Sequence, residues 1–477
     1  MKRIRARKNV GGGVDRISQL PEPTIHRIMS RLSPKEVVRT SVLSRTWYHF
    51  KASYPVLEFN EMHFGDEEHH TNLDKFRQVI YNSLNHFCRN KLGLVAFHID
   101  IFSPSLSSDL DSWIRLALEN KVKSLHLCVR TEPILSVPPT KLSILPQPLF
   151  SSKTLTSIKL TMCCLKQPLS IFSSIRKLSL VNCHLKCPIV LKNDDCSFLE
   201  HLVLKYCYGF KSVHISNLRR LHTVDVSYCF FSFELVVASQ SIQTMYIYAR
   251  ARSKPWSIIN IDGCHHLKFL YLQSGTITDK ELHSLLSKLT LIEELYLYHC
   301  QQIETIYISN PCLKTLLFVC LFHSPLRIIE IAAPSLKNFM YMADSRVCRI
   351  KVTGCCNLKT LVLKKYMGPE TTFHDLLSKC PLLENLWMVQ CDELERLELL
   401  NPRLKRLHLV TCSKLNSVKV DSPNLFEFCC TGLKATTIPG VGGARSEYER
   451  SMHWYYRLKE VLVHSVGLDF KNLTDLF

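Results

Sequence analysis

Cysteine and histidine are the residues of this chain most able to do chemistry, with 21 of each among 477 residues. The run Cys264-His265-His266 comes nearest to a metal site, because thiolates and imidazoles are the usual zinc ligands. The histidines follow no recognised arrangement of nucleophile, base and orienting group. The glycine-rich segment 439–443 lacks the Lys-Ser/Thr end of a phosphate-binding loop. The sequence therefore predicts no catalytic site, no metal and no cofactor.

An internal repeat explains many of the cysteines. The pattern Leu-x-x-Leu-x-Leu-x-x-Cys recurs at separations of 20 to 25 residues, which is the range of leucine-rich repeats. Its openings are Leu155, Ile175, Leu199, Leu221, Ile242, Leu267, Ile292, Leu313, Leu336, Leu358, Leu383, Leu404 and Leu425.

Eleven cysteines hold fixed places in this repeat. Because a small buried side chain suits a place where the backbone turns inward, we interpret these residues, Cys264 included, as structural. Seven stand eight residues after an opening, namely Cys163, Cys183, Cys207, Cys229, Cys300, Cys391 and Cys412. Four stand three residues before the next opening, namely Cys196, Cys264, Cys355 and Cys380.

One repeat cannot bury its apolar strand alone, so stacked repeats should form a curved solenoid. We expect a parallel sheet on the concave side, with helices and irregular turns on the convex side. Thr278 and Glu281 predict a capped outer helix, and residues 373–383 have a similar pattern. Residues 122–127 predict an earlier repeat strand and 458–463 a late one.

Two short helices are predicted near the N-terminus. After Leu20 and Pro21, apolar residues at positions 25, 28, 29 and 32 have helical spacing. Ser33, Pro34 and Glu36 then form the start of a second helix, with a proline at its first position. Such a small helical module should need a partner or a neighbouring domain for stability.

The residues of this module resemble the F-box of plant proteins. Asp15-Arg-Ile-Ser-Gln-Leu-Pro21 and Val38-Arg-Thr-Ser-Val-Leu-Ser-Arg-Thr-Trp47 carry the resemblance, although Thr46 and Glu22-Pro23 depart from the usual pattern. The resemblance implies docking onto a Skp-family adaptor, which bridges to a cullin scaffold. By position, the adaptor-binding residues would be Leu20, Pro21, Ile25 and Ile28, with Leu43 and Trp47 either joining this surface or packing beneath it.

The predicted fold class is α/β, with a small helical F-box followed by a leucine-rich-repeat solenoid. Residues 1–14 form a flexible basic tail, 15–60 the F-box, 61–121 a connecting and capping region, and 122–477 the solenoid. Loop insertions are expected near 129–154 and 431–457, where proline or glycine is frequent.

Residues that alternate with the buried aliphatics should line the concave face of the solenoid. They include an aromatic patch that we predict to be exposed and to bind the substrate, although such rings also suit strand surfaces. The residues of this patch are Tyr246, Tyr248, Phe269, Tyr271, Tyr296 and Tyr298, with Trp387 farther along. A basic strip on the same face comprises Lys159, Lys177, His201 and Lys205.

The resemblance implies a non-catalytic substrate-recognition subunit of an SCF-type cullin-RING ubiquitin ligase, with an unknown protein as its target. A protein- or RNA-binding scaffold outside a ligase is the alternative, as is a small-molecule receptor of the same architecture. The net charge is +19, yet nucleic acid is not the expected partner. No apolar run approaches the roughly 20 residues that cross a bilayer, so we expect a nuclear or cytoplasmic protein without a membrane partner.

Overall fold

The computed structural model describes residues 20–29, 31–32, 34–40, 54–64, 72–130, 143–145, 149–150, 152–229, 234–249, 258–273, 277–300, 302–320, 325–343, 348–431 and 445–446. The chain divides into two compact units, Met1–Cys164 and Leu165–Phe477. Among the described residues, no helix combines the length and apolar character needed to cross a lipid bilayer.

Two short helices open the first unit, as the apolar spacing predicts. Helix α1 (Glu22–Met29) is followed by α2 (Pro34–Thr40), which begins at the expected proline. Ile25 and Met29 of α1 are buried together with Val37 of α2. This core is small, so the pair of helices should depend on its surroundings for stability.

Four strands of the first unit stack in parallel and in register. The sequence predicts the first repeat strand at residues 122–127, but the parallel stacking already begins with the two strands before it. The elements are β1 (Val56–Asn60), η1 (Glu61–Phe64), α4 (Leu73–Arg89), β2 (Ala96–Ile101), η2 (Pro104–Leu106), α5 (Ser107–Glu119), β3 (Ser124–Val129) and β5 (Ser157–Thr161), with β4 (Ser143–Ile144) paired to β6 (Cys163–Leu165).

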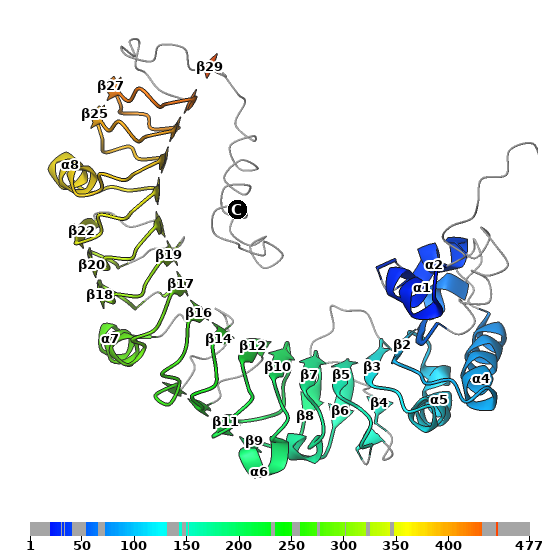
Figure 1. Ribbon diagram of the computed structural model, residues 1–477. Coiled ribbons are helices and arrows are strands. Elements are labelled where there is room, and N and C mark those ends of the chain that lie inside the picture. Colours follow the sequence, from blue (N-terminus) through cyan, green and yellow to red (C-terminus); the bar gives the residue numbers. More distant parts are fainter. Residues whose placement is uncertain are drawn as a thin grey trace, which may run out of the picture. The chain divides into compact units, whose positions relative to one another are not determined.

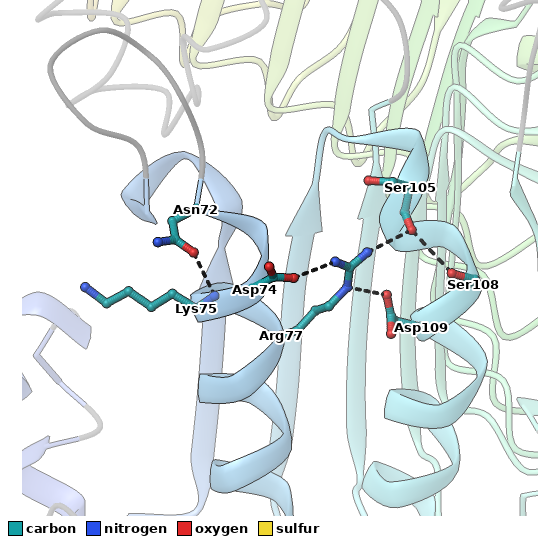
Figure 2. A network of polar contacts seen from close by, with 7 residues as sticks. All are labelled: Asn72, Asp74, Lys75, Arg77, Ser105, Ser108 and Asp109. Carbon is teal, nitrogen blue, oxygen red and sulfur yellow. Dashed lines mark hydrogen bonds and ion pairs between the residues drawn. The ribbon is translucent and has the colours of Figure 1, made fainter.

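Arg77 joins the first turns of α4 and α5, as Figure 2 shows. Its Nε donates to Oδ2 of Asp109 at 2.8 Å, and its Nη1 lies 3.1 Å from Oδ1 of Asp74. Both carboxylates lie in the first turn of a helix, where the helix dipole favours negative charge. The buried rings of Phe76 and Trp113 pack edge to face between the same two helices, with centroids 6.1 Å apart. These contacts bind α4 and α5 into one layer.

The second unit is a solenoid whose inner strands pair in parallel, each with the next inner strand along the chain. The predicted repeat openings before Leu425 are buried, and Leu425 is half-buried. The inner strands are β7 (Lys177–Val181), β10 (His201–Lys205), β12 (Thr223–Cys229), β14 (Thr244–Ala249), β16 (Phe269–Gln273), β17 (Glu294–Tyr298), β19 (Thr315–Cys320), β21 (Asn338–Ala343), β23 (Thr360–Lys364), β24 (Asn385–Val389), β26 (Arg406–Val410), β28 (Glu427–Thr431) and β29 (Arg445–Ser446).

Shorter parallel sheets and helices form the outer side of this unit (Figure 1). Helix α7 lies beside β18 and α8 beside β22, so helices protect both edges of the sheet β18–β20–β22. The outer elements are η4 (Leu169–Ile171), β8 (His184–Leu185), β9 (Ile189–Lys192), α6 (Asn193–Cys196), β11 (Ser212–Ser216), β13 (Glu234–Ala238), β15 (Ile258–Asn260), α7 (Asp279–Lys288), β18 (Thr305–Ser309), β20 (Ile328–Ala332), β22 (Arg349–Thr353), α8 (Glu370–Ser378), β25 (Arg396–Leu400) and β27 (Ser417–Asp421).

The two predicted outer helices are both present, but one is displaced. Thr278 caps α7 as predicted, because its Oγ1 accepts the Glu281 N–H and the Glu281 carboxylate accepts the Thr278 N–H. The second helix was expected over residues 373–383, whereas α8 ends at Ser378. It begins directly after Pro369, three residues before the first large apolar side chain used to place it.

The repeat cysteines share one backbone setting. All seven that stand eight residues after an opening are buried, and each follows a residue of positive φ, such as Gln390 (φ 54°) before Cys391. The Cys391 thiol donates to the Leu363 carbonyl at 3.4 Å. Burial raises the pKa of Cys391, so this thiol stays protonated. The structural interpretation of these cysteines is confirmed.

Candidate functional site

Aromatic residues of three neighbouring strands meet on the inner face of the second unit. The register sets Tyr246 of β14 beside Tyr271 of β16, and Tyr271 beside Tyr296 of β17. Tyr248 and Tyr298 flank Gln273 in the next row. Since side chains alternate along a strand, both rows lie on the same face. The structure therefore brings together rings that are far apart in sequence.

Five of the tyrosines form a stack that we call the tyrosine ladder, namely Tyr206, Tyr228, Tyr248, Tyr271 and Tyr298. Successive ring centroids are 4.8, 3.7, 6.4 and 4.7 Å apart, with interplanar angles of 15°, 28°, 8° and 23°. The widest step still lies within the range of direct ring pairs, about 4.5–7 Å. The rings thus use their faces mainly on one another.

Sequence reasoning missed two members of this ladder. Tyr206 and Tyr228 have φ of 55° and 57°, so they do not follow the strand alternation used to predict the inner face. Each directly precedes a repeat cysteine, Cys207 or Cys229. An aromatic residue in that place is the signal that could have found them.

Exposure divides the predicted aromatic patch in two. Tyr246, Tyr248, Phe269 and Tyr271 are half-buried, and we call these four residues the open patch. Tyr296, Tyr298 and Trp387 are only 0%, 2% and 0% exposed, so the prediction that they are exposed is wrong. They pack in one apolar cluster, called the closed patch here, whose other members are Leu317, Val319, Met340, Met342 and Val362.

The tyrosine hydroxyls differ in how they are satisfied. Tyr271 donates to Oε1 of Gln273 at 3.1 Å, and Tyr296 donates to Oε2 of Glu294 at 2.8 Å. The buried Tyr298 hydroxyl has no hydrogen-bond partner within the described structure. Burial raises the pKa of Tyr298, so this phenol remains protonated and serves the closed patch through its ring.

Trp387 belongs to a tightly stacked group that the sequence did not suggest. Its ring lies 3.6 Å from that of His408, with an interplanar angle of 4°. Nε2 of His408 is 3.2 Å from Oε1 of Glu427, and Nε of Arg406 is 3.0 Å from Oε2 of the same carboxylate. Since Trp387 and His408 are 0% and 1% exposed, their stacked rings belong to the interior and offer no surface to a partner.

The predicted basic strip is divided between the two units. In the second unit, Lys177 is exposed, and the register sets it beside His201. Nζ of Lys205 pairs with Oδ2 of Asp225 at 2.9 Å, and Ser227 donates to the same carboxylate. Burial and the charge of Lys177 lower the pKa of His201. Of the strip members in the second unit, Lys177 is therefore the cation that a partner can reach most readily.

Lys159 lies in the first unit, beside His126 in the register, and His126 lies beside His98. The two imidazole centroids are 5.6 Å apart. Burial, with the nearby charge of Lys159, lowers the pKa of His126 to about 4. The His126 imidazole is therefore neutral at pH 7. The row formed by Lys159, His126 and His98 carries less positive charge than its composition suggests.

The predicted adaptor-binding residues have different surroundings on the helix α1 side of the first unit. Ile28 is 37% exposed, Pro21 is exposed and Leu20 is half-buried. Ile25 is 0% exposed because it packs against Met29 and Val37, so its predicted place on a docking surface is corrected to the internal core. Leu43 and Trp47 lie outside the described residues.

Residues 264–266, the segment whose sequence comes nearest to a metal site, are arranged as part of the repeat. Cys264 is buried, and its thiol donates to the Val237 carbonyl at 3.4 Å. Burial raises the pKa of this thiol to about 11, whereas His265 and His266 are exposed. Among the residues the structure describes, no three His, Cys, Asp or Glu side chains are grouped as metal ligands would be.

Three protein-family models match this chain. The F-box domain model covers residues 17–57. The model of the At1g61320/AtMIF1 LRR domain covers residues 230–366, and that of the LRR repeats of FBD-associated F-box protein At5g56370 covers 354–438. The open patch lies within the first of these two repeat regions.

The chain is also similar to proteins of Arabidopsis thaliana. It is 49% identical over 59 residues to the F-box protein At1g60400, covering 12% of this chain and 15% of that protein. It is 29% identical over 147 residues to the F-box/FBD/LRR-repeat protein At4g26340, covering 31% and 32%. The longest of these three matches is to the F-box/LRR-repeat protein At3g18150, with 24% identity over 300 residues, or 61% and 60%. Each match covers less than two thirds of the relative.

Proposed function

Because the chain is an F-box and leucine-rich-repeat protein of the plant kind, we propose that it is the substrate-recognition subunit of an SCF-type cullin-RING ubiquitin ligase. In this proposal the F-box binds a Skp-family adaptor and, through it, a cullin scaffold. The inner face of the second unit binds the target protein. The chain performs no bond chemistry itself, and it acts in the nucleus or cytoplasm.

The F-box match over residues 17–57 carries the adaptor half of the proposal. Exposed Pro21 and Ile28, with half-buried Leu20, would supply apolar contact area on the helix α1 side. Ile25 contributes indirectly, because it holds α1 against α2. Leu43 and Trp47 remain predicted members of the same surface.

The adaptor contact can be tested by replacing Ile28 with glutamate. A carboxylate placed in an apolar contact would have to be desolvated without a partner, so co-purification of adaptor and cullin should fall at least about tenfold. Met62→Glu is a matched control, since Met62 is 62% exposed in the first unit and lies outside the F-box match. Equal adaptor binding by wild type and Ile28→Glu would contradict the proposed docking surface.

The open patch supports the substrate half of the proposal. Tyr246, Tyr248, Phe269 and Tyr271 are large, partly accessible and grouped on adjacent strands, which is the composition of binding hot spots. Phe269 and Tyr271 pack against the closed patch. This packing limits the freedom of these two side chains before binding, so less side-chain entropy is lost when a partner binds.

A further inference from the structure

We infer that the accessible rings of the tyrosine ladder, which exclude buried Tyr298, and the neighbouring basic end of the inner face bind an acidic peptide segment of the target protein. This inference rests on the proposed function and gives a chemical class to its substrate. The residues that define the surface are the open patch together with Tyr206, Tyr228, Lys177 and His201.

The stacking of the tyrosine ladder determines which part of each ring a partner can contact. Between Tyr206, Tyr228 and Tyr248 the centroid distances are 4.8 and 3.7 Å, so these ring faces are occupied by each other. A partner therefore meets ring edges. The edge of an aromatic ring carries the positive part of its quadrupole, whereas the face carries the negative part. Ring edges favour carboxylates and carbonyl oxygens, while cations would need the faces.

The charged residues beside the ladder favour the same partner. The charged and imidazole side chains of inner strands β7 to β16 that face inward are Lys177, His201, Lys205 and Asp225, within the described residues. Asp225 is 7% exposed and already binds Lys205 and Ser227, so it projects no free negative charge. Lys177 is exposed and has no ion-pair partner within the described part of the chain. At the β7 end of this surface the accessible charge is therefore positive. At the other end, Glu294 of β17 lies beside Phe269 in the register, is half-buried and accepts a hydrogen bond from Tyr296.

The spacing fits a short extended peptide. Strands β7 and β14 are separated by three steps of the parallel sheet, or about 14 Å. At about 3.3 Å per residue, roughly five extended residues connect Lys177 with the open patch. We expect an acidic residue at one end of this segment and an apolar residue at the other.

Single-stranded nucleic acid fits this surface less well. Sequence-tolerant binding of unpaired bases depends on stacking against exposed aromatic faces, and most of these faces are used within the ladder. Contacts of phosphate with Lys177 alone would give weak binding, because the affinity grows with the number of phosphates that the protein neutralises. An acidic peptide instead uses both the ring edges and Lys177.

The test measures fluorescence anisotropy of labelled peptides with the full chain in complex with its adaptor. Three peptides of about twelve residues share their apolar residues and carry Asp/Glu, Lys/Arg or Ser/Gln at the other positions, and a uridine oligonucleotide serves as competitor. The acidic peptide should bind at least about tenfold more tightly than the basic one. Lys177→Glu should remove most of this preference, since complementary charge sets specificity.

Lys419→Glu is the matched control, because Lys419 is an exposed strand lysine on outer strand β27. It should leave acidic-peptide binding unchanged. The inference is overturned if the three peptides bind alike or not at all, if the oligonucleotide displaces the acidic peptide, or if both lysine variants have the same effect. Retention of adaptor by the same protein samples separates these outcomes from a failure of the proposed function, which would appear as loss of the adaptor.

Discussion

The open and closed patches lie on repeats of the same kind and face the same side of the sheet, yet their side chains differ in exposure. Tyr271 and Tyr296 are direct neighbours in the register, but Tyr271 is half-buried and Tyr296 is fully buried. Alternation along a strand fixes which face a side chain occupies. Access to a partner depends in addition on what packs across that face. Two adjacent tyrosines can therefore serve binding and stability separately.

The largest expected effect is the loss of stability when the closed patch is emptied. Trp387→Ala should lower the free energy of unfolding by about 3–5 kcal/mol, because it leaves a cavity in a fully buried cluster. Urea unfolding followed by circular dichroism measures this change. Leu400→Ala is the control, since Leu400 is 72% exposed, and its effect should stay within about 0.5 kcal/mol. Equal losses in both variants would contradict the burial of Trp387 in the closed patch.

The next effect concerns binding at the open patch. The double variant Tyr248→Ala, Tyr271→Ala should reduce capture of the target protein at least about tenfold, with adaptor binding unchanged. Its loss of stability should be less than that of Trp387→Ala, because both rings are only half-buried. Quantitative pull-down and urea unfolding of the same samples measure the two quantities. If the variant captures the target protein normally but unfolds at lower urea concentration, the open patch serves stability and not binding, as the closed patch does.

The smallest effect is expected at the ion pairs of Glu384, which lies three residues before Trp387 in the sequence. Nζ of Lys405 lies 2.7 Å and Nζ of Lys359 3.2 Å from the Glu384 carboxylate. The hydrogen bond from Lys405 lowers the pKa of Glu384. A lowered pKa stabilises the folded state above the ordinary value of 4.5, and this contribution is lost as pH falls through the folded-state pKa.

Glu384→Gln should therefore lose a few tenths of a kcal/mol at pH 7, since the partly exposed pair is screened by solvent. The difference from wild type should vanish in strong acid. Unfolding free energies at pH 7 and pH 3 measure it, with Glu398→Gln as the control, because Glu398 is an exposed glutamate on outer strand β25. A difference that grows as pH falls would have the wrong sign for this account.

Local sequence signals predicted much of the fold because they report short-range physics. The Thr278–Glu281 cap and the proline at the start of α2 depend on residues three or fewer positions apart. The periodic cysteines marked the repeat because each occupies the same local setting, a buried thiol directly after a residue of positive φ. Strands β1 and β2 do not show the same period in the sequence, because α4 and α5 lengthen their repeats beyond the 20 to 25 residues of the later repeats.

The candidate site could be predicted only in part. The register of Tyr246, Tyr271 and Tyr296 follows from alternation, but the burial of Tyr296 depends on Leu317 and Met340 in later repeats. The burial of Ile25 could not be predicted for a similar reason. Its helical spacing places it on the apolar face of α1, while contact with Val37 of another helix makes that face internal.

In the proposed function, two separate surfaces of this chain hold the ligase and the substrate. The most direct measurement is quantitative mass spectrometry of tagged wild type, Ile28→Glu and Tyr248→Ala, Tyr271→Ala proteins purified from plant cells at matched folded amounts. We predict that Ile28→Glu loses adaptor and cullin but keeps the target protein, and that the tyrosine variant does the reverse. The account would be contradicted if one variant lost both the ligase subunits and the target protein. It would also be contradicted if both variants kept both.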